Sequence, residues 1–309
     1  MTVSEDALAE QFTGLRAHLI GVAYRLTGTL SDAEDAVQDA WLRLAGLAED
    51  KRAEILDLKA WLTTVVGRLC LDRLRSAPAQ REQYIGPWLP EPVVTPFGAA
   101  PSDDPLETVV RDDGVRMAAM VLLDRLTPEQ RVAFVLHDAF AVPFDEIAET
   151  LGCTPATARQ HASRARRAVA DADPPPRASM GEQRAVVEKL MTALLGGDLE
   201  TVVEVLHPDV VLVGDGNGKG RTARQIMVGA DKLARFFAGL AKIYDPNALA
   251  TSQLVLVNGD LGMITPEHPG DEEYRPLDRH VQTFAVRDGK IVAIYDVVNP
   301  DKLTRVPEL

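Results

Sequence analysis

The stretch PFDEIAETLGCTPATARQHASRARRAV, residues 143–169, predicts two short helices joined by a tight turn. Gly152 marks the turn, Thr154 is a good N-cap, and Pro155 suits the first helical position, where its missing N–H costs nothing. Apolar residues spaced three or four apart predict the buried side of the second helix: Ala158, Ala162, Ala165 and Val169. The remaining face is polar and basic. Such a helix can enter a DNA major groove, whereas the alternative is a solvated helix end whose arginines complement the helix dipole.

Length and composition limit the number of domains and the kinds of partner. The chain has 309 residues, enough for two or three domains, and a formal net charge of −13. A contact with DNA must therefore be local, and weak unaided binding favours a protein that works beside a larger partner. The two cysteines, Cys70 and Cys153, are expected to be small core residues rather than a disulfide or metal pair. We expect no cofactor, no metal and no membrane contact, and a cytoplasmic location, because neither a signal peptide nor a long apolar span occurs.

The first 80 residues predict three amphipathic helices. The first ends near Gly28, and Ser31 with Glu34 forms a capping box for the second, DAEDAVQDAWLRL (32–44). Its exposed acidic face is either an ordinary solvated surface or a docking surface. The third helix, LKAWLTTVVGRLCLDRLRSA (58–77), is basic on one side. Two of its residues, Arg68 and Asp72, are spaced four apart and can pair with each other.

These helices resemble the second conserved region of bacterial sigma-70-type factors of the short extracytoplasmic-function group. LDRLTPEQRVAFVLHDAFAVPFDEIAETLGCTPATARQHASRARRAV, residues 123–169, resembles their fourth region. The two resemblances cover roughly half of the chain and fall in the family's order. They imply that region 2 binds the clamp coiled coil of core RNA polymerase and melts the −10 promoter element. They also imply that region 4 meets the polymerase flap and reads the −35 element through a helix-turn-helix.

The resemblance assigns roles residue by residue. The residues expected to bind core polymerase are Asp35, Gln38, Asp39, Trp41 and Arg43. Those expected at the −10 element are Trp61, Arg68, Asp72, Arg73 and Arg75. Those expected at the −35 element are Thr157, Arg159, Gln160, His161, Arg164, Arg166 and Arg167. Many family members carry Asn in place of Arg68, and often Arg in place of His161, so base preference does not transfer with these roles.

The segment between the two helical regions is rich in proline. Residues 78–105 contain seven prolines and predict an extended connector. It also carries side chains too apolar for a free tether: Tyr84, Ile85, Trp88, Leu89 and Phe97. The run YIGPWLPEP (84–92) resembles the linker motif of one sigma subgroup, whose members have a fused C-terminal SnoaL-like domain.

The last part of the chain has helices first and strands later. It follows a Pro174–Pro176 spacer and contains two hairpin signals, one at Asn258-Gly259 and one at Asp288-Gly289. This order predicts an α+β cone similar to the SnoaL-like, or nuclear transport factor 2-like, superfold. The whole chain is then a multidomain protein of two all-α bundles followed by that cone. The expected segments are region 2 at 1–80, the linker at 81–105, region 4 at 106–172, the spacer at 173–180 and the SnoaL-like domain at 181–309.

Two more motifs in this domain resemble those of the same subgroup. DGNGK (215–219) resembles a glycine-rich loop of the subgroup in which Asn217 replaces a glycine, and NPDKL (299–303) resembles its C-terminal motif. Asparagine tolerates a positive φ, so the loop can keep its turn. The resemblance implies an intramolecular controller that replaces a separate anti-sigma protein, with room for a small ligand in the cone. The residues expected to regulate are Trp88, Leu89, Pro90, Asp215, Gly216, Asn217, Gly218, Lys219, Asn299, Pro300, Asp301, Lys302 and Leu303.

Two other classes of protein remain open. A one-component regulator would bind an operator unaided and sense a ligand in the C-terminal domain. A SnoaL-like enzyme tethered to DNA would need a general base, for which Asp215, His207 and His280 are the candidates. No paired acid/base spacing stands out and fold does not confer function, so we expect no enzyme.

Overall fold

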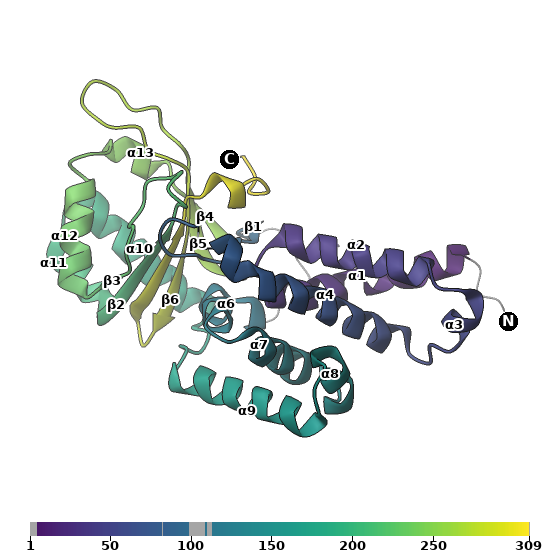
Figure 1. Cartoon of the computed structure of the whole chain (residues 1–309). Coiled ribbons are helices and arrows are strands. Elements are labelled where there is room, and N and C mark those ends of the chain that lie inside the picture. Colours follow the sequence, from purple (N-terminus) through teal and green to yellow (C-terminus); the bar gives the residue numbers. More distant parts are fainter. Residues whose placement is uncertain (1–4, 82, 99–108, 110–112, 309) are drawn as a thin grey trace. The chain divides into compact units, whose positions relative to one another are not determined.

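The computed structural model of the chain describes residues 5–81, 83–98, 109 and 113–308. Contacts divide the chain into two compact units. The helical unit comprises residues 1–82, 102–115 and 119–173, and the sheet unit comprises residues 83–101, 116–118 and 174–309. The described part of the proline-rich linker, residues 83–98, therefore belongs to the sheet unit rather than to the helices that it follows (Figure 1).

The first half of the helical unit is a bundle of long helices. Its elements are α1 (Glu5–Thr27), α2 (Leu30–Ala45), α3 (Glu49–Ala53) and α4 (Leu58–Arg81). The expected N-cap of the second helix was wrong by two residues. Thr29 rather than Ser31 caps α2, because its hydroxyl accepts a hydrogen bond from the backbone N–H of Asp32. Buried aliphatic residues join α1, α2 and α4: Leu19, Leu26, Val37, Leu44, Leu62 and Val66.

The second half of the helical unit contains the helix-turn-helix. Its elements are η1 (Asp113–Val115), α6 (Met117–Asp124), α7 (Pro128–Phe134), the π-helical turn η2 (Val135–Ala139), α8 (Phe144–Leu151) and α9 (Pro155–Asp171). Gly152 ends α8 at φ 66°, and Thr154 caps α9 by accepting from the N–H of Thr157. Ala158, Ala162 and Ala165 are fully buried, as their spacing predicted, whereas the fourth predicted residue, Val169, is only half-buried near the end of the helix.

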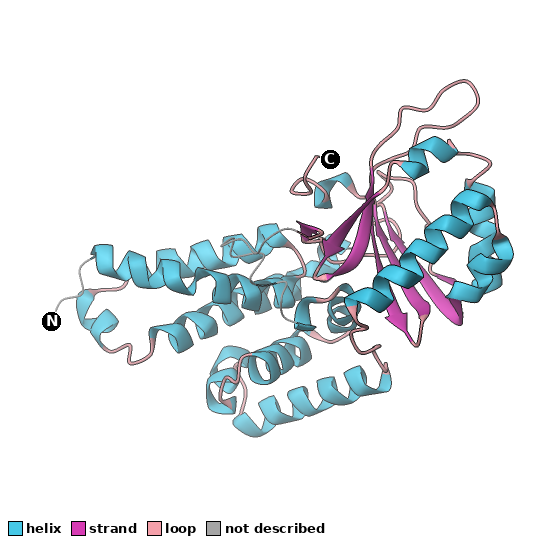
Figure 2. Ribbon diagram, turned by 180° about the vertical axis from the view of Figure 1, so that it is seen from behind, coloured by secondary structure: helices cyan, strands magenta, loops and turns pink. Residues whose placement is uncertain are grey.

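The sheet unit is a curved sheet with helices on one face. Its helices are α10 (Met180–Gly196), α11 (Leu199–Val205), α12 (Ala230–Leu240) and α13 (Pro246–Ala250), with the turn η3 (Pro300–Lys302) near the C-terminus. Its strands are β1 (Val94–Pro96), β2 (Leu206–Asp215), β3 (Met227–Val228), β4 (Gln253–Val257), β5 (Asp260–Thr265), β6 (His280–Arg287) and β7 (Lys290–Val297). Helices α10, α11 and α12 pack their apolar sides on the sheet (Figure 2). This is the expected α+β cone.

The strand order is β1-β4-β5-β6-β7-β2-β3, and only the β2–β7 pair is parallel within the described sheet. Both predicted hairpins are present. Asn258 and Gly259 link β4 to β5, and Asp288 and Gly289 link β6 to β7, all with positive φ. The edge strand β1 comes from the linker and pairs antiparallel with β4, so the predicted extended connector is in part a strand of the cone.

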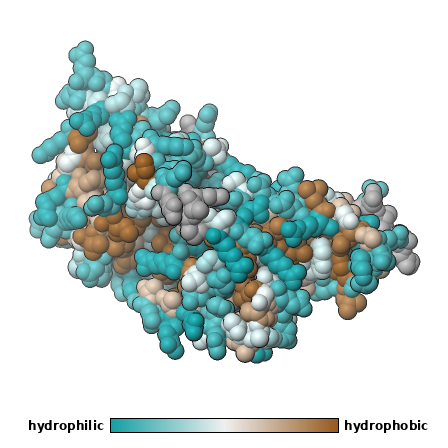
Figure 3. All heavy atoms as spheres, viewed as in Figure 1, coloured by the Kyte–Doolittle hydropathy of each residue, from teal (hydrophilic) through white to brown (hydrophobic). Residues whose placement is uncertain are grey.

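Hydrophobic residues reach the surface at several places, as Figure 3 shows for the visible face. Among described residues, the large hydrophobic side chains that stay exposed are Leu42, Leu56, Ile85, Leu195, Leu199, Ile226 and Val228. None of the helices in the described ranges is long and apolar enough to span a bilayer.

Candidate functional site

The recognition helix α9 presents a polar outer face. Arg159, Gln160, Arg164, Arg166 and Arg167 are exposed, while Thr157 and His161 are half-buried. Local contacts fix two of the arginines. Arg166 Nε donates to Asp138 at 2.7 Å, and the Arg159 guanidinium lies 5.4 Å from the centre of the Phe144 ring. The face predicted for the −35 element is therefore open to solvent within the helical unit.

The predicted polymerase-binding residues lie along one side of α2. Asp35, Gln38 and Arg43 are exposed, whereas Asp39 and Trp41 are half-buried. Trp41 packs on Phe12 of α1 with 4.9 Å between ring centres, so its position is fixed. The side chains form a polar surface around one anchored aromatic ring. That arrangement suits a docking face, because a rigid aromatic residue loses little entropy on binding.

The basic side of α4 faces other helices of the same unit. Arg68 pairs with Glu149 of α8 at 3.5 Å, and Arg75 pairs with Glu129 of α7 at 3.0 Å. The expected pairing of Arg68 with Asp72 is thus replaced by a pairing with α8. Arg73 contacts Asp39 of α2 at 3.3 Å. Of the residues predicted at the −10 element, Asp72 is exposed and Trp61 is half-buried.

The linker is bound by one buried carboxylate in the sheet unit. Asp215, at the end of β2, has no exposed surface. Its oxygens accept hydrogen bonds from the Tyr84 hydroxyl, from the Leu89 backbone N–H at 2.7 Å and from Lys302 Nζ at 2.7 Å. Burial, followed by the hydrogen bond to Asp215, raises the pKa of Tyr84, which therefore stays a hydroxyl donor. We name these four residues, together with Asn299, the linker clasp.

Lys302 connects the C-terminal motif to the linker. Its ammonium donates to the Leu89 carbonyl as well as to Asp215, and lies 4.2 Å from the centre of the Trp88 ring. The Asn299 amide donates to the Tyr84 hydroxyl at 3.0 Å. A buried ammonium with a carboxylate, a carbonyl and an aromatic face as neighbours has its charge well satisfied. The three motifs predicted to regulate thus meet at one place.

The glycine-rich loop fits closely around the linker. Gly218 has φ 69°, and a Cβ at this position would lie 2.8 Å from Ile85 Cδ1. Asn217 has φ 46°, and its side-chain oxygen accepts from the Ile85 backbone N–H at 3.1 Å. The asparagine therefore adopts a positive φ, as expected from the sequence, and contacts the linker. The remaining loop residue, Lys219, forms an ion pair with Asp301.

A second buried carboxylate, which sequence reasoning missed, lies at the start of β5. Asp260 accepts from Arg116 at 2.8 Å and from Arg177 at 2.9 Å, and the Arg116 guanidinium also donates to the Pro175 carbonyl. Arg116 immediately precedes α6, and Arg177 lies in the spacer after α9. Nearby, Asn258 exchanges two hydrogen bonds with the backbone of Val93. The only sequence signal was the Asn-Gly turn beside Asp260.

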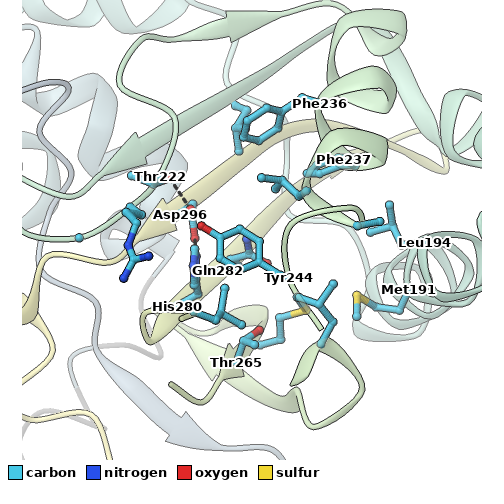
Figure 4. Close-up of a pocket in the computed structure, with 18 of the residues that line it drawn as sticks. Met191, Leu194, Thr222, Phe236, Phe237, Tyr244, Thr265, His280, Gln282 and Asp296 are labelled. Carbon is cyan, nitrogen blue, oxygen red and sulfur yellow. Dashed lines mark hydrogen bonds and ion pairs between the residues drawn. The ribbon is translucent and has the colours of Figure 1, made fainter. Parts of the chain in front are cut away.

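The cone encloses a cavity of about 320 Å³. Of the three general-base candidates, only His280 lines it. Asp215 is part of the linker clasp, and His207 lies in β2, where its Nδ1 accepts from the backbone N–H of Asp209. His280 Nδ1 lies 2.9 Å from Asp296, which also accepts from the Thr222 hydroxyl at 2.5 Å (Figure 4). Asp296 was not predicted from the sequence.

His280 and Asp296 shift each other's pKa in the directions that favour the ion pair. Burial opposes the charge on His280, but the Asp296 carboxylate, its hydrogen bond and the more distant Asp278 raise the His280 pKa overall. Burial likewise opposes the charge on Asp296, yet His280 and hydrogen bonds from Thr222 and Gln282 lower its pKa. The pair places an imidazole beside a buried carboxylate in the cavity wall.

The cysteines do not form a disulfide. Cys70 is buried and Cys153 is half-buried, and both are free thiols. Burial raises the pKa of the Cys70 thiol to about 12, so it is inert as a nucleophile. Over the described ranges, no three His, Cys, Asp or Glu side chains cluster so as to hold a metal ion.

Comparisons with known proteins match all three parts. Residues 12–79 match the Sigma-70 region 2 family, residues 116–169 match Sigma-70, region 4, and residues 187–294 match the SnoaL-like domain family. The chain is 52% identical over 303 residues to ECF RNA polymerase sigma factor SigJ of Mycobacterium tuberculosis, covering 96% of this chain and 93% of that protein. It is 36% identical over 230 residues to the probable ECF sigma factor SigI of that species, covering 74% and 75%. The crystal structure of SigJ matches with a TM-score of 0.81 at 51% identity, over 96% of this chain and 98% of that one.

The cavity pair predicts a pH-dependent contribution to stability. Because the folded-state pKa of His280 lies above 6.5, its protonation stabilises the fold fully below that pH and ceases to do so as pH rises through the raised pKa. The Asp296 contribution is present above 3.8 and is lost as pH falls through the lowered pKa. The melting temperature of His280→Gln should therefore fall furthest below wild type near pH 5–6 and approach it above neutrality. A constant difference from pH 5 to 9 would contradict this.

The linker clasp predicts local protection of the linker. In Asp215→Asn the Lys302 ammonium keeps its burial but loses its counter-charge, which costs about 3 kcal/mol. The equilibrium for linker opening should rise roughly 100-fold, seen as faster hydrogen exchange in a peptide that spans residues 83–93. Glu204→Gln, which breaks an exposed ion pair with Lys189, is the control and should leave that peptide unchanged. Equal exchange in the two variants would show that the clasp does not hold the linker.

Proposed function

Because the chain belongs to the extracytoplasmic-function sigma factor family of RNA polymerase, we propose that its SnoaL-like domain controls its activity by binding the linker between regions 2 and 4. The observation that carries the proposal is the linker clasp, in which Asp215 and Lys302 together bind the Leu89 backbone. The family implies core RNA polymerase and promoter DNA as partners, so the site of action is the cytoplasm.

The contacts of the sheet unit fall on both sides of region 4. Asp215 binds the linker that follows region 2, while Asp260 binds Arg116 just before α6 and Arg177 just after α9. A domain that contacts these connections can restrain how far regions 2 and 4 separate without touching either recognition surface. Control then requires contacts that differ between a restrained and an extended chain. The linker clasp supplies such a contact, because it exists only while the linker is docked.

Contacts inside the helical unit would also have to change when the chain binds a promoter. Residues proposed to meet the −10 element are paired inside the unit: Arg68 with Glu149 and Arg75 with Glu129. Gly67 immediately precedes Arg68 in α4, and a Cβ there would come 3.1 Å from Leu136. Helix α4 therefore packs closely on region 4. DNA phosphates and these glutamates compete for the same arginines, so promoter binding must open the packing.

The site residues divide by role under this proposal. Asp35, Gln38, Asp39, Trp41 and Arg43 dock on core polymerase. In α9, Thr157, Arg159, Gln160 and Arg164 contact the −35 element, while Arg166 and Arg167 contact phosphates. His161 stands where other family members often carry Arg, so no base is assigned to it. The cavity histidine has no catalytic task in this scheme, and the chain acts as a regulator rather than an enzyme. The fused domain takes the place of a separate anti-sigma protein.

Run-off transcription with purified core polymerase tests the control. A truncation after Ala172 and full-length Asp215→Asn should both change the transcript yield in the same direction. The change should be roughly tenfold if the free energies of the restrained and extended chains differ by about 1.4 kcal/mol. Glu204→Gln should match wild type. No transcription and no core binding by any of these proteins would remove the proposal and favour a stand-alone regulator. Equal transcript yields from all of these proteins would show a sigma factor whose activity the C-terminal domain does not control.

A second variant tests the packing of α4 on region 4. Gly67→Val places two methyl groups against Leu136 and Thr150, so the packed form of the helical unit should be disfavoured by about 1–3 kcal/mol. The affinity of the full chain for core polymerase should then rise. Gly14→Val is the matched control, because a Cβ at Gly14 meets no atom within 4 Å. Both variants should keep a wild-type circular dichroism spectrum. If they then bind core polymerase with the same affinity, the proposed competition for the arginines of α4 is contradicted.

A further inference from the structure

The π-helical turn η2 is a part of region 4 on which two helices of region 2 pack. Helix α1 lies against this turn, and a Cβ on Gly67 of α4 would come 3.1 Å from Leu136, which is a residue of the turn. Leu136 is fully buried. A single π-helical turn is rare in proteins, and such turns occur frequently at functional sites. In this chain the turn stands where region 2 meets region 4.

Phe140 fixes the end of the turn on α1. Its ring lies edge-on to the His18 ring with 5.1 Å between centres, and the Arg25 guanidinium lies 5.1 Å from the same ring. His18 is held in turn by a 3.0 Å hydrogen bond with the Thr63 hydroxyl of α4. Burial, with Lys59 and Arg25 as smaller causes, lowers the pKa of His18 to about 4. His18 is therefore neutral at neutral pH, and Arg25 is the cation beside the ring. Both contacts require an aromatic side chain at this position.

The backbone after the turn is strained. Ala141 has φ 54°, a conformation that glycine adopts freely and alanine adopts only at a cost in free energy. Its N–H donates to the His137 carbonyl at 3.0 Å, and the N–H of Val142 donates to the Leu136 carbonyl at 2.9 Å. A strained conformation persists only where surrounding contacts hold it. The contacts with α1 and α4 are of this kind, so their loss lets the turn relax toward regular α-helical geometry.

The same turn carries the partner of an arginine in the recognition helix. Asp138 accepts from Arg166 Nε at 2.7 Å, and both side chains are partly exposed. Asp138 lies two residues from Leu136 and two from Phe140, which are the side chains that region 2 holds. Because successive residues of a helix point about 100° apart, a change from π-helical to α-helical geometry changes the direction in which Asp138 points.

A second contact runs from the turn toward α9. The His137 ring stacks on the Phe144 ring with 3.9 Å between centres, and the Arg159 guanidinium lies 5.4 Å from the centre of Phe144. The turn therefore touches the recognition helix directly through Asp138 and indirectly through Phe144. Region 2 and the recognition helix bias one short element from opposite sides.

We propose that η2 couples the packing of region 2 to the recognition helix: while α1 and α4 hold the turn, Asp138 holds Arg166, and when they leave, Arg166 is released to a DNA phosphate. Asp138 and Phe140 are positioning residues in this scheme, because both act through Arg166. The Asp138 carboxylate and a phosphate compete for one guanidinium, so packing of region 2 and binding of DNA oppose each other. The role of Arg166 at phosphates rests on the proposed function, whereas the coupling between the two contacts of the turn does not.

Nuclear magnetic resonance of arginine side chains tests the coupling without DNA. In the full chain, isotope-labelled at the arginine Nε atoms, the Arg166 Nε–H signal is identified by its loss in Arg166→Gln. Asp138→Asn gives the position of that signal when the ion pair is broken. Phe140→Leu keeps an apolar side chain but removes the ring, and should shift the Arg166 signal toward the same position. Arg184 Nε donates to Glu188 at 2.6 Å within α10, so its signal is the matched control and should not move.

A second variant disturbs the turn from the other helix. Gly67→Val places methyl groups against Leu136, and it should shift the Arg166 signal in the same direction as Phe140→Leu does. Circular dichroism shows whether each variant is folded, and either one decides the question. An Arg166 signal that stays at its wild-type position in the folded variants would overturn the coupling.

Binding to DNA tests the release of Arg166. Because phosphate contacts do not depend on base sequence, the probe is a fluorescent duplex of about 24 base pairs and arbitrary sequence, titrated with the full chain in about 25–150 mM KCl. Asp138→Asn should tighten binding by about two- to fivefold, as expected for the loss of one partly exposed competing ion pair. It should also steepen the dependence of affinity on salt by about one counterion. No binding of the duplex by Asp138→Asn at the lowest salt would overturn the release to phosphate.

Two backgrounds separate release of Arg166 from a general loss of negative charge. In Arg166→Gln, adding Asp138→Asn should no longer tighten binding, whereas in Arg167→Gln it should tighten binding as in the wild type. Equal gains in the two backgrounds would overturn the competition for Arg166. The gain from Asp138→Asn should also shrink in Phe140→Leu, because the turn has then already relaxed, and an undiminished gain would overturn the coupling. Run-off transcription that shows no control by the C-terminal domain would contradict the proposed function but leave these results standing.

Discussion

A buried carboxylate must find its hydrogen-bond partners inside the protein, and Asp215 finds them in three distant parts of the chain. The Tyr84 hydroxyl and the Leu89 N–H come from the linker, and the Lys302 ammonium comes from the C-terminal turn. Breaking any one contact leaves a desolvated polar group, which costs more than the contact adds when it is present. The linker can therefore be docked or undocked as a whole, but half-docked states are disfavoured. This makes the clasp a two-state element, which a regulatory contact requires.

Asp215 and Asp260 use the same chemistry at two junctions of the chain. The first binds the linker after α4, and the second binds Arg116 before α6 and Arg177 after α9. Neither carboxylate contacts α9, which carries the residues proposed for the −35 element. The proposed regulation would act through the connections and would leave promoter choice to the recognition helices. The fused domain would then change how readily regions 2 and 4 are presented to the promoter, without changing what they recognise.

The sequence predicted the elements with strong local signals. Alanines at three- and four-residue spacing placed the buried side of α9, and the Asn-Gly and Asp-Gly turns placed both hairpins, because periodicity and positive φ are properties of short segments. Local signals failed where partners lie far apart. The roles of Asp260 and Asp296 depend on Arg116 and His280, and nothing in the local sequence marks either pairing. Motif resemblance brought Asp215 and Lys302 into one predicted regulatory set, but only the fold shows that they share a contact. The cap of α2 was misplaced because Thr29 and Ser31 are chemically similar N-caps.

The energies involved fit the proposed control of the helical unit by a linker contact. The ion pairs Arg68–Glu149 and Arg75–Glu129 are partly exposed, and pairs of this kind contribute about 0–1 kcal/mol each. Closure of the unit therefore depends more on the packing at Gly67 than on charge. Under the proposed function, DNA phosphates compete for the same arginines, and the packed form would open once region 4 is free to move. A restraint on the linker of a few kcal/mol is then comparable to the difference between the packed and open forms. Small changes in the free energy of linker docking therefore give large changes in the ratio of packed to open chains, because each 1.4 kcal/mol shifts that ratio tenfold.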